Sequence, residues 1–245
     1  MELDLKTSLG SIVDLCMPRS CVVCSRSLNL SEDNICIPCL ADLPLTRYEE
    51  FQRNPMAERF NALLALRRCE RPLGRREDYV RASSLFFYTA DYCNITPSLK
   101  YGRNFAAGSF FAGMLGQRLS LSSLFSDVDR LIPVPLHWSR LLSRGYNQAE
   151  IIARELARSL PRAEVDTCSL RRRRPTRSQT GLGSAGRLDN VKNAFVATPP
   201  PGGSHILLVD DVFTGGSTLC ECYMALRDAA PANVRISVAT LAFAQ

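Results

Sequence analysis

The sequence predicts an α/β protein in which helices flank a mostly parallel sheet, with a small cysteine-rich module near the N-terminus. The first observation is an apolar run at residues 205–209 that lacks polar alternation, which is typical of a parallel strand buried on both faces. The second is a pair of Cys-x-x-Cys motifs at residues 21–24 and 36–39. The third is a further strand-like run at residues 129–135, followed by a helical pattern from Asn147.

Length and composition set the broad class. A chain of 245 residues with 46% hydrophobic content can form one medium domain and a small module. No apolar run approaches the ~20 residues of a membrane span, and the acidic start Met1-Glu-Leu-Asp-Leu-Lys6 does not resemble a signal peptide. We therefore expect a cytoplasmic protein without a membrane span, in which ten cysteines favour metal over disulfides.

The cysteine motifs predict a structural zinc module over residues 1–45. Eleven residues separate the two pairs, and four thiolates would complete a tetrahedral site with no open position; the ligands are Cys21, Cys24, Cys36 and Cys39. Metal binding would supply folding free energy that such a short segment lacks. The alternative, a thioredoxin-like redox pair, needs a βαβ context that neither motif has.

Residues 46–78 are interpreted as a helix and a basic linker, and residues 79–245 as the main domain. Asn54-Pro55 is typical of a helix start, and an apolar stripe from Met56 to Leu66 continues the helix. Residues 70–78 mix arginines with acids, Pro72 and Gly74, and six arginines lie within residues 67–81. This stretch is either a solvated linker or a segment that attracts nucleic acid. A strand is expected over residues 79–88 and an apolar helix around residues 105–115.

Two carboxylates, Asp210 and Asp211, follow the apolar strand and precede the Gly/Ser/Thr loop at residues 214–218. Ligands bind at the carboxyl ends of strands in open α/β sheets, and a loop entering a helix offers N–H groups to anions. Carboxylates beside a phosphate cradle indicate a sugar phosphate. The alternative is a capped helix without a ligand, since Thr218 and Glu221 resemble a capping box.

A second anion site is predicted between the strand at residues 129–135 and the helix that begins at Asn147. Arg140, Arg144 and the flexible Gly145 lie in this interval, and arginine forks bind phosphate oxygens in a bidentate way. Alternatively, these arginines only contact acidic neighbours on the surface. His137 is interpreted as a local hydrogen-bonding residue rather than a catalyst.

Residues 171–187 form an arginine-rich stretch that is expected to be a loop because it also contains proline, glycine and serine. Its charge would suit pyrophosphate or a nucleic-acid backbone, and a solvated loop with neither role is the alternative. Residues 190–196 are expected to form a short strand that returns to the sheet.

The segment around Asp210 resembles the phosphoribosyl pyrophosphate (PRPP) loop of type I phosphoribosyltransferases. The order of further motifs extends the resemblance to most of the chain. After the four cysteines come Pro-Val-Pro-Leu-His at 133–137, Arg-Gly-Tyr-Asn-Gln at 144–148, Thr-x-x-Gln at 176–179 and Val-Asp-Asp-Val at 209–212. This order is similar to that of the ComF family, which includes the ComFC and GntX proteins. The similarity runs from about residue 15 to residue 243.

The resemblance implies a type I phosphoribosyltransferase fold and a role for each motif. Asp210 and Asp211 would hold the ribose hydroxyls and act as the catalytic residues. The neighbouring segment would bind PRPP through Val212, Phe213, Thr214, Gly215, Gly216, Ser217 and Thr218. Arg140, Arg144 and Gly145 would face the pyrophosphate, and the arginine-rich loop would close over PRPP with Arg177, Gln179 and Arg187. Gly215 departs from the family, which usually has a small hydroxyl residue there.

Two functions follow as hypotheses. In the first, the protein is a phosphoribosyltransferase that uses Mg²⁺ and PRPP, with an unknown acceptor, and is linked to nucleotide metabolism and to DNA uptake in competence. In the second, it is a non-catalytic PRPP or nucleotide sensor that holds single-stranded DNA with its zinc module and arginine-rich loop. Gly215 favours the second hypothesis, whereas the acid pair favours the first. Other competence proteins and a second copy of the chain are the further expected partners.

Overall fold

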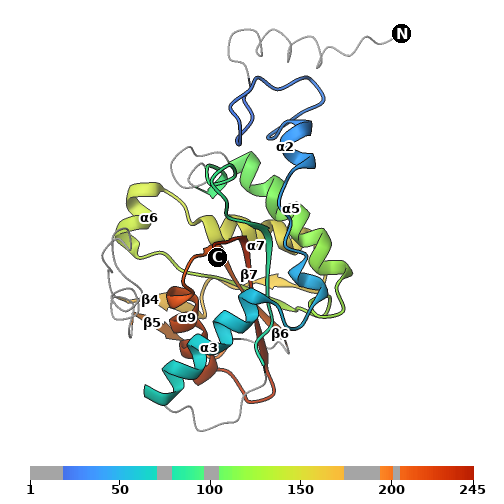
Figure 1. Cartoon of the computed structure of the whole chain (residues 1–245). Helices are drawn as coiled ribbons and strands as arrows, with labels where there is room; N and C mark the ends of the chain where they lie inside the picture. Colours follow the sequence, from blue (N-terminus) through green and yellow to red (C-terminus); the bar gives the residue numbers. More distant parts are fainter. Residues whose placement is uncertain (1–18, 71–78, 97–104, 174–193, 201–204) are drawn as a thin grey trace.

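A five-stranded sheet forms the centre of the computed structural model, which describes residues 19–70, 79–96, 105–173, 194–200 and 205–245. Every pairing in this sheet is parallel, which confirms the predicted fold class (Figure 1). Its strands, in spatial order, are β1 (Ala82–Phe87), β7 (Arg235–Phe243), β6 (His205–Phe213), β2 (Arg130–Pro133) and β3 (Glu164–Val165).

Strand β6 lies at the centre of the sheet and is longer than the sequence predicted. It pairs with β2 only as far as Pro133↔Val209, but it pairs with β7 from His205↔Arg235 to Phe213↔Phe243. Proline has no N–H to donate to a ladder, and β2 ends at Pro133. Because β7 continues beyond that point, Asp210 and Asp211 lie within β6 rather than after it.

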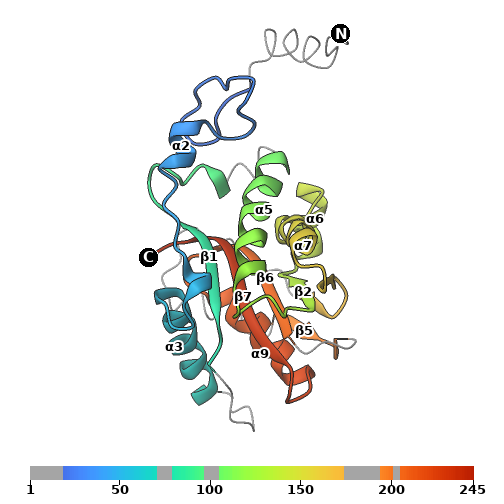
Figure 2. The ribbon, with the colours of Figure 1, turned by 90° about the vertical axis from the view of Figure 1, so that its right-hand side faces the viewer.

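Helices cover both faces of the sheet (Figure 2). One face packs against α3 (Pro55–Glu70) and α9 (Ser217–Ala229), where Ile206 and Leu208 of β6 join a cluster with Phe60 and Met224. The other face packs against α5 (Phe105–Leu121) and α7 (Gln148–Ser159). The alternating directions of strand side chains therefore divide the core into two layers, as a non-alternating apolar strand requires.

The helix starts that were predicted from the sequence are confirmed. The side chain of Asn54 accepts a hydrogen bond from the Ala57 N–H at 2.9 Å, directly before α3 begins at Pro55. Asn147 is the N-cap of α7, and its Oδ1 accepts from the Ala149 N–H at 3.2 Å. Asn and Asp are favoured at this position because they satisfy N–H groups that have no partner within the helix.

Between β2 and α7 the structure has a helix, α6 (Trp138–Arg144), to which no element was assigned from the sequence. His137 caps this helix with its ring, which accepts a hydrogen bond from the Ser139 N–H, so its reading as a local hydrogen-bonding residue is confirmed. Gly145 ends the helix in the left-handed region at φ 81°. Glycine is the usual residue at this position because other residues are strained there.

The arginine-rich stretch begins with a strand rather than a loop. Strand β4 (Leu170–Arg172) pairs antiparallel with β5 (Phe195–Ala197) in a separate two-stranded sheet. The strand expected around residues 190–196 therefore joins this small sheet and not the main one. Residues 174–193 lie outside the described part of the chain. A local pattern can predict that a segment forms a strand, but it does not specify which other strand will be its partner.

The N-terminal segment contains α2 (Ile37–Ala41) and the short helix η1 (Tyr48–Glu50). Between them the chain runs along the outer edge of β1. There the Phe87 N–H donates to the Pro44 carbonyl at 2.8 Å, and the Thr46 N–H donates to the Leu85 carbonyl at 3.1 Å. This contact covers an edge that would otherwise expose unpaired backbone groups. None of the helices in the described ranges has the length and apolar character needed to span a membrane.

A polar network with the buried His205 at its centre closes the amino ends of β6 and β7. His205 is fully buried, and its Nδ1 lies 2.7 Å from Asp127 Oδ1 while its Nε2 lies 2.8 Å from Ser237 Oγ. Arg235 forms an ion pair with the same carboxylate. Burial lowers the pKa of His205, although the Asp127 carboxylate opposes this effect. The pKa of Asp127 is also lowered: burial acts to raise it, but the bonds from Arg235 and His205 outweigh burial.

This network predicts a loss of stability in mild acid. Below the ordinary histidine pKa of 6.5 the unfolded chain binds a proton that folded His205 resists, so the free energy of unfolding falls as the pH drops. Urea unfolding measured between pH 7.5 and pH 5.5 should show this slope. His205→Gln should flatten the slope, whereas Ser237→Ala, which keeps the imidazole, should retain it. An unchanged slope in His205→Gln would contradict the assignment.

Candidate phosphate site and metal centre

The acid pair lies where the side-chain alternation of β6 changes phase. Leu207, Val209 and Val212 face one core cluster, and Ile206, Leu208 and Phe213 face the other. A regular strand would place residues 209 and 212 on opposite faces. Asp210 and Asp211 occupy this irregular step, and the Asp211 N–H donates to Asp210 Oδ1 at 2.9 Å. Asp210 is partly exposed and Asp211 is 7% exposed.

The loop after β6 turns sharply into α9. Gly216 has φ 72° and is the N-cap of α9, whose first residue is Ser217. A Cβ at Gly216 would lie 2.7 Å from Phe213 Cζ and 3.3 Å from Leu63 Cδ2. Glycine is thus required by the backbone conformation and by the close approach of two side chains. No side chain caps α9, so the loop presents a helix N-terminus of the kind that binds anions.

The capping box proposed for Thr218 and Glu221 is wrong. The N-cap is Gly216, two residues before Thr218, and Glu221 instead pairs with Arg67 of α3. The Arg67 Nε–H donates to Glu221 Oε1 at 2.7 Å, and the two side chains are 8% and 5% exposed. Removing one partner of such a buried pair leaves an uncompensated charge. Together with the Leu63 contact, this pair holds the first turns of α9 against α3.

The other residues of the loop are more open. Thr214 is exposed, Thr218 is partly exposed, and a Cβ at Gly215 would meet nothing within 4 Å. Phe213 is fully buried and contacts the rings of Phe60 and Phe243, so its side chain serves the core. Among the residues of this segment predicted to bind PRPP, the exposed or partly exposed ones are therefore Asp210, Val212, Thr214, Gly215 and Thr218, and the others are buried.

The second predicted anion segment follows β2, which is next to β6 in the sheet. Asn147 ties it to the end of that strand, since its Nδ2 donates to the Val134 carbonyl at 3.0 Å. Arg144 is partly exposed and its guanidinium lies 3.4 Å from Gln148 Oε1. Gly145 is exposed, and a Cβ there would meet nothing within 4 Å. Parallel neighbours end at the same edge of a sheet, so this segment and the acid pair share the carboxyl edge.

Four of the predicted residues fall wholly or partly outside what the structure describes. Arg177, Gln179 and Arg187 lie in residues 174–193, and the side chain of Arg140 is also outside the described part although its backbone belongs to α6. Their proposed contacts with pyrophosphate stay predictions.

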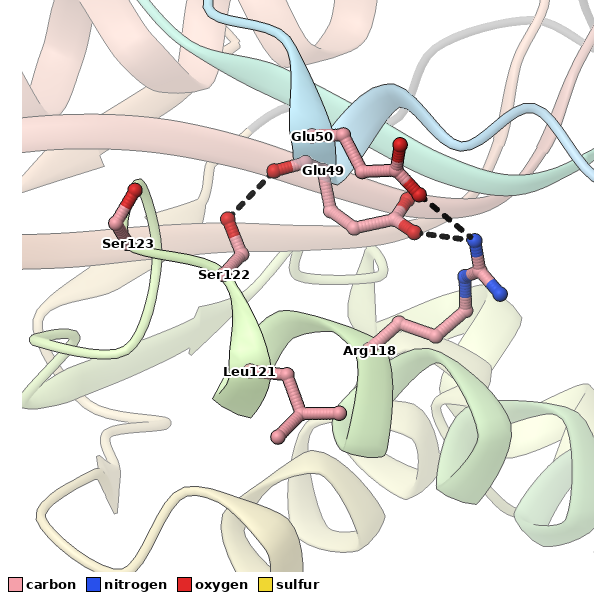
Figure 3. Close-up of a pocket in the computed structure, with 6 residues that line it drawn as sticks. All are labelled: Glu49, Glu50, Arg118, Leu121, Ser122 and Ser123. Carbon is pink, nitrogen blue, oxygen red and sulfur yellow. Dashed lines mark hydrogen bonds and ion pairs between the residues drawn. The ribbon is translucent and has the colours of Figure 1, made fainter.

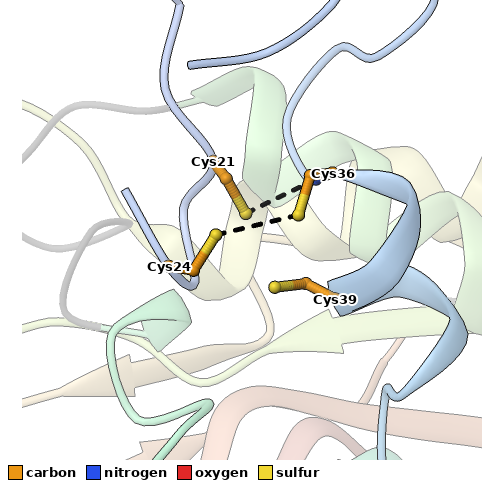
Figure 4. A group of neighbouring side chains, drawn as sticks. All are labelled: Cys21, Cys24, Cys36 and Cys39. Carbon is orange, nitrogen blue, oxygen red and sulfur yellow. Dashed lines mark hydrogen bonds between the residues drawn. The ribbon is translucent and has the colours of Figure 1, made fainter. Parts of the chain in front are cut away.

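The four motif cysteines converge on one point (Figure 4). The sulfur atoms of Cys21, Cys24, Cys36 and Cys39 all lie within 4.8 Å of one another, and those of Cys24 and Cys36 are 3.7 Å apart. Four sulfurs around zinc at about 2.3 Å would be roughly 3.8 Å apart. The donor set and its spacing therefore fit a structural zinc ion with four thiolate ligands.

The surroundings of the cluster favour a thiolate at Cys21 and oppose one at Cys39. Burial raises the pKa of Cys21, but N–H groups from the backbone of Cys24 and Cys36 offset this and leave it at about 7. For Cys39, burial and hydrogen bonds with the other three thiols raise the pKa. Sulfurs that share one site compete for charge, and a bound metal would relieve that competition. Tyr92, which follows β1, donates to the Cys39 carbonyl at 2.9 Å and joins the module to the domain.

A separate pocket of about 340 Å³ lies on the side of the sheet where η1 packs beside β1 (Figure 3). It is formed by η1 and the C-terminal end of α5, and its lining residues are Glu49, Glu50, Arg118, Leu121, Ser122 and Ser123. The buried Glu49 pairs with Arg118 at 2.5 Å, and the Ser122 hydroxyl donates to the Glu49 carbonyl at 2.5 Å. No local pattern in the sequence marks the lining residues of this pocket, because contacts between distant segments bring them together.

The cysteine geometry predicts about one zinc ion per purified chain, measurable by elemental analysis after purification under reducing conditions. Cys36→Ser should remove the metal and lower the unfolding temperature, because metal binding contributes folding free energy. The control is Cys168→Ser, which changes an exposed thiol outside the cluster and should keep both the zinc and the stability. Wild-type protein without zinc would overturn the assignment.

Part of this chain matches a known domain type, and several known proteins are similar to it. Residues 141–244 match the phosphoribosyl transferase domain. The chain is 30% identical over 225 residues to the DNA utilization protein YhgH of Salmonella typhimurium, covering 91% of this chain and 96% of that protein. It is 39% identical over 102 residues to Competence protein F of Haemophilus influenzae, covering 40% of this chain and 44% of that protein. With its parallel sheet, its four-cysteine cluster and these relatives, the chain belongs to the ComF family of proteins that carry a phosphoribosyltransferase domain.

Proposed function

We propose that the chain binds PRPP together with Mg²⁺ at the junction of β6 and α9. The observation that carries this proposal is the acid pair at the phase change of β6, directly before a glycine turn and an uncapped helix N-terminus. Carboxylates accept hydrogen bonds from ribose hydroxyls, and the N–H groups of a helix N-terminus suit a 5′-phosphate. The match of residues 141–244 to the phosphoribosyl transferase domain supports the same ligand.

In the transfer reaction that we propose, the bond between ribose C1 and the pyrophosphate oxygen breaks, and the oxygen keeps the electron pair. An acceptor of unknown identity forms the new bond to C1 and loses a proton. Asp210 and Asp211 would orient the ribose and offset the positive charge that develops on it, which is positional and electrostatic catalysis. Arg144 and the open backbone at Gly145 would bind the departing pyrophosphate. Mg²⁺ supplies further positive charge to the pyrophosphate when it is bound.

We further propose that this activity serves the uptake and use of DNA. Two relatives support this role by name, the DNA utilization protein YhgH and Competence protein F. The first of them aligns with this chain over nearly its whole length. Other proteins of the same process would then be its partners.

A second function is favoured by Gly215, where the phosphate loop lacks a hydroxyl. In this alternative the chain binds PRPP or a nucleotide as a signal, without transferring the ribosyl group, while it holds single-stranded DNA. A Cβ fits at Gly215 without a clash, so packing does not explain the absence of a side chain. The two functions differ in turnover: only the transferase releases pyrophosphate when an acceptor is present.

Calorimetric titration of zinc-loaded protein with PRPP and Mg²⁺ tests the common part of both proposals. The wild type should bind, and Asp210→Asn/Asp211→Asn should abolish binding because the ribose loses both charged acceptors. Thermal unfolding of the double variant checks that it remains folded. Wild-type protein that fails to bind PRPP would contradict the proposal, as would a folded double variant that binds with unchanged affinity.

Restoring the missing hydroxyl should strengthen binding. A hydrogen bond to a charged group is worth roughly 1.5–3 kcal/mol, so Gly215→Thr is expected to lower the Kd for PRPP by about tenfold or more. Gly215→Ala is the matched control, since it adds a Cβ in the same open space but no donor, and it should leave the Kd unchanged. Equal affinities for the two variants would show that residue 215 does not reach the phosphate.

A further inference from the structure

Helix α6 turns an apolar face to solvent. Trp138, Leu141 and Leu142 are 66%, 43% and 76% exposed, although they belong to the most hydrophobic residue types of the chain. Their spacing of three and four residues places them side by side on one helix face. Trp138 is also the single tryptophan among the 245 residues. We call these three residues the α6 face.

The fold of the described residues does not depend on this face. None of its three residues belongs to either core cluster or to the partly buried residues packed against them. Polar contacts fix the ends of α6 instead, because His137 caps the start of the helix and the Gly145 N–H donates to the Leu141 carbonyl at 2.7 Å. A surface helix normally turns its apolar stripe inward, so an outward stripe indicates a binding surface.

The position of the face relates it to the proposed PRPP site. Helix α6 follows β2 and leads through Gly145 and Asn147 into α7, so it begins at the carboxyl edge of the sheet. Asp210, Asp211 and the phosphate loop lie at the same edge, on the neighbouring strand. A ligand that covers the α6 face would therefore lie next to the proposed ribose and phosphate site.

The charge of α6 narrows the chemistry of its partner. Its seven residues include two arginines and no acid, and Arg144 in its last turn is partly exposed. The whole chain carries a formal net charge of +6. A partner with exposed flat apolar groups and a negative backbone complements an aromatic and leucine surface beside arginine. Unpaired bases meet this description, whereas the bases of a duplex are stacked and paired inside it.

We propose that single-stranded nucleic acid binds across the α6 face, with one base stacked on the indole of Trp138. A neighbouring base or sugar contacts Leu141 and Leu142, and the phosphates lie near Arg144. This inference rests on the proposed role in DNA use and moves the contact with the strand from the cysteine module and the arginine-rich loop to α6. A membrane surface also attracts aromatic and basic helices, but this helix has only seven residues. Anionic lipid is therefore the outcome against which the proposal is tested.

The single tryptophan gives a direct readout. Titration of the wild type with a thymidine oligonucleotide should quench its fluorescence, and a labelled oligonucleotide should report affinity by anisotropy. Loss of one base stacked on an aromatic side chain weakens binding by roughly tenfold, which is the expected effect of Trp138→Ala. Trp138→Phe keeps a stacking ring and should recover most of the affinity. Leu121→Ala is the control, because Leu121 is 88% exposed at the opposite edge of the sheet.

An abasic oligonucleotide of the same length completes the test, since it keeps the phosphates and lacks the bases. Trp138→Ala should leave its affinity unchanged. An equal loss on both oligonucleotides would overturn the stacking role, and so would quenching by anionic vesicles but not by the oligonucleotide. Wild-type protein that binds PRPP but no oligonucleotide would overturn this inference alone. Loss of PRPP binding in Asp210→Asn/Asp211→Asn should leave the α6 face able to bind the strand.

Discussion

Burial of strand β6 on both faces is the constraint on which the rest of the structure depends. Residues 206–209 have no exposed surface, and each contributes to one of the two core layers. Such a strand needs hydrogen-bonded neighbours on both edges and helices on both faces. At its carboxyl end the β2 partner stops while the β7 partner continues. Only at that point can β6 carry polar side chains at a low free-energy cost of burial, and Asp210 and Asp211 lie there.

The two edges of the sheet use polar groups in opposite ways. At the amino edge, His205, Asp127, Ser237 and Arg235 satisfy one another. At the carboxyl edge, the exposed Thr214, the open space around Gly215 and an uncapped helix N-terminus face outward. Polar groups that are fully paired rigidify a core, whereas groups near solvent can exchange water for a ligand. This asymmetry leaves the carboxyl edge as the side of the described sheet with polar groups open to a ligand.

Local patterns made part of this architecture predictable. The cysteine cluster follows from short spacings, and β6 follows from an apolar run whose length and lack of alternation are both local properties. The starts of α3 and α7 follow from single capping residues. These predictions succeeded because the physical cause lies within a few residues of its effect.

Other features depend on distant partners, and the sequence did not reveal them. Glu221 has the spacing of a capping residue, but Arg67 on another helix binds it. No helix was predicted around Trp138, because its apolar residues have no core to face, yet capping residues at both ends of the segment support a helix there. Strand β5 pairs with β4 in a separate sheet rather than with the main sheet. The sequence predicted the acid pair, but not the change in side-chain alternation of β6 between residues 209 and 212.

The contacts of α3 determine which fragments of this chain could keep the structure of the turn before α9. Leu63 lies against the glycine turn, and Arg67 holds the first turns of α9, yet α3 precedes the matched domain by many residues. An excised fragment that starts at residue 141 would lose this support, together with strand β1. In this chain, the segment that matches the family domain is therefore not a self-contained structural unit. The glycine turn before α9 depends on the N-terminal half of the chain, so a transplanted copy of the segment would need that half as well.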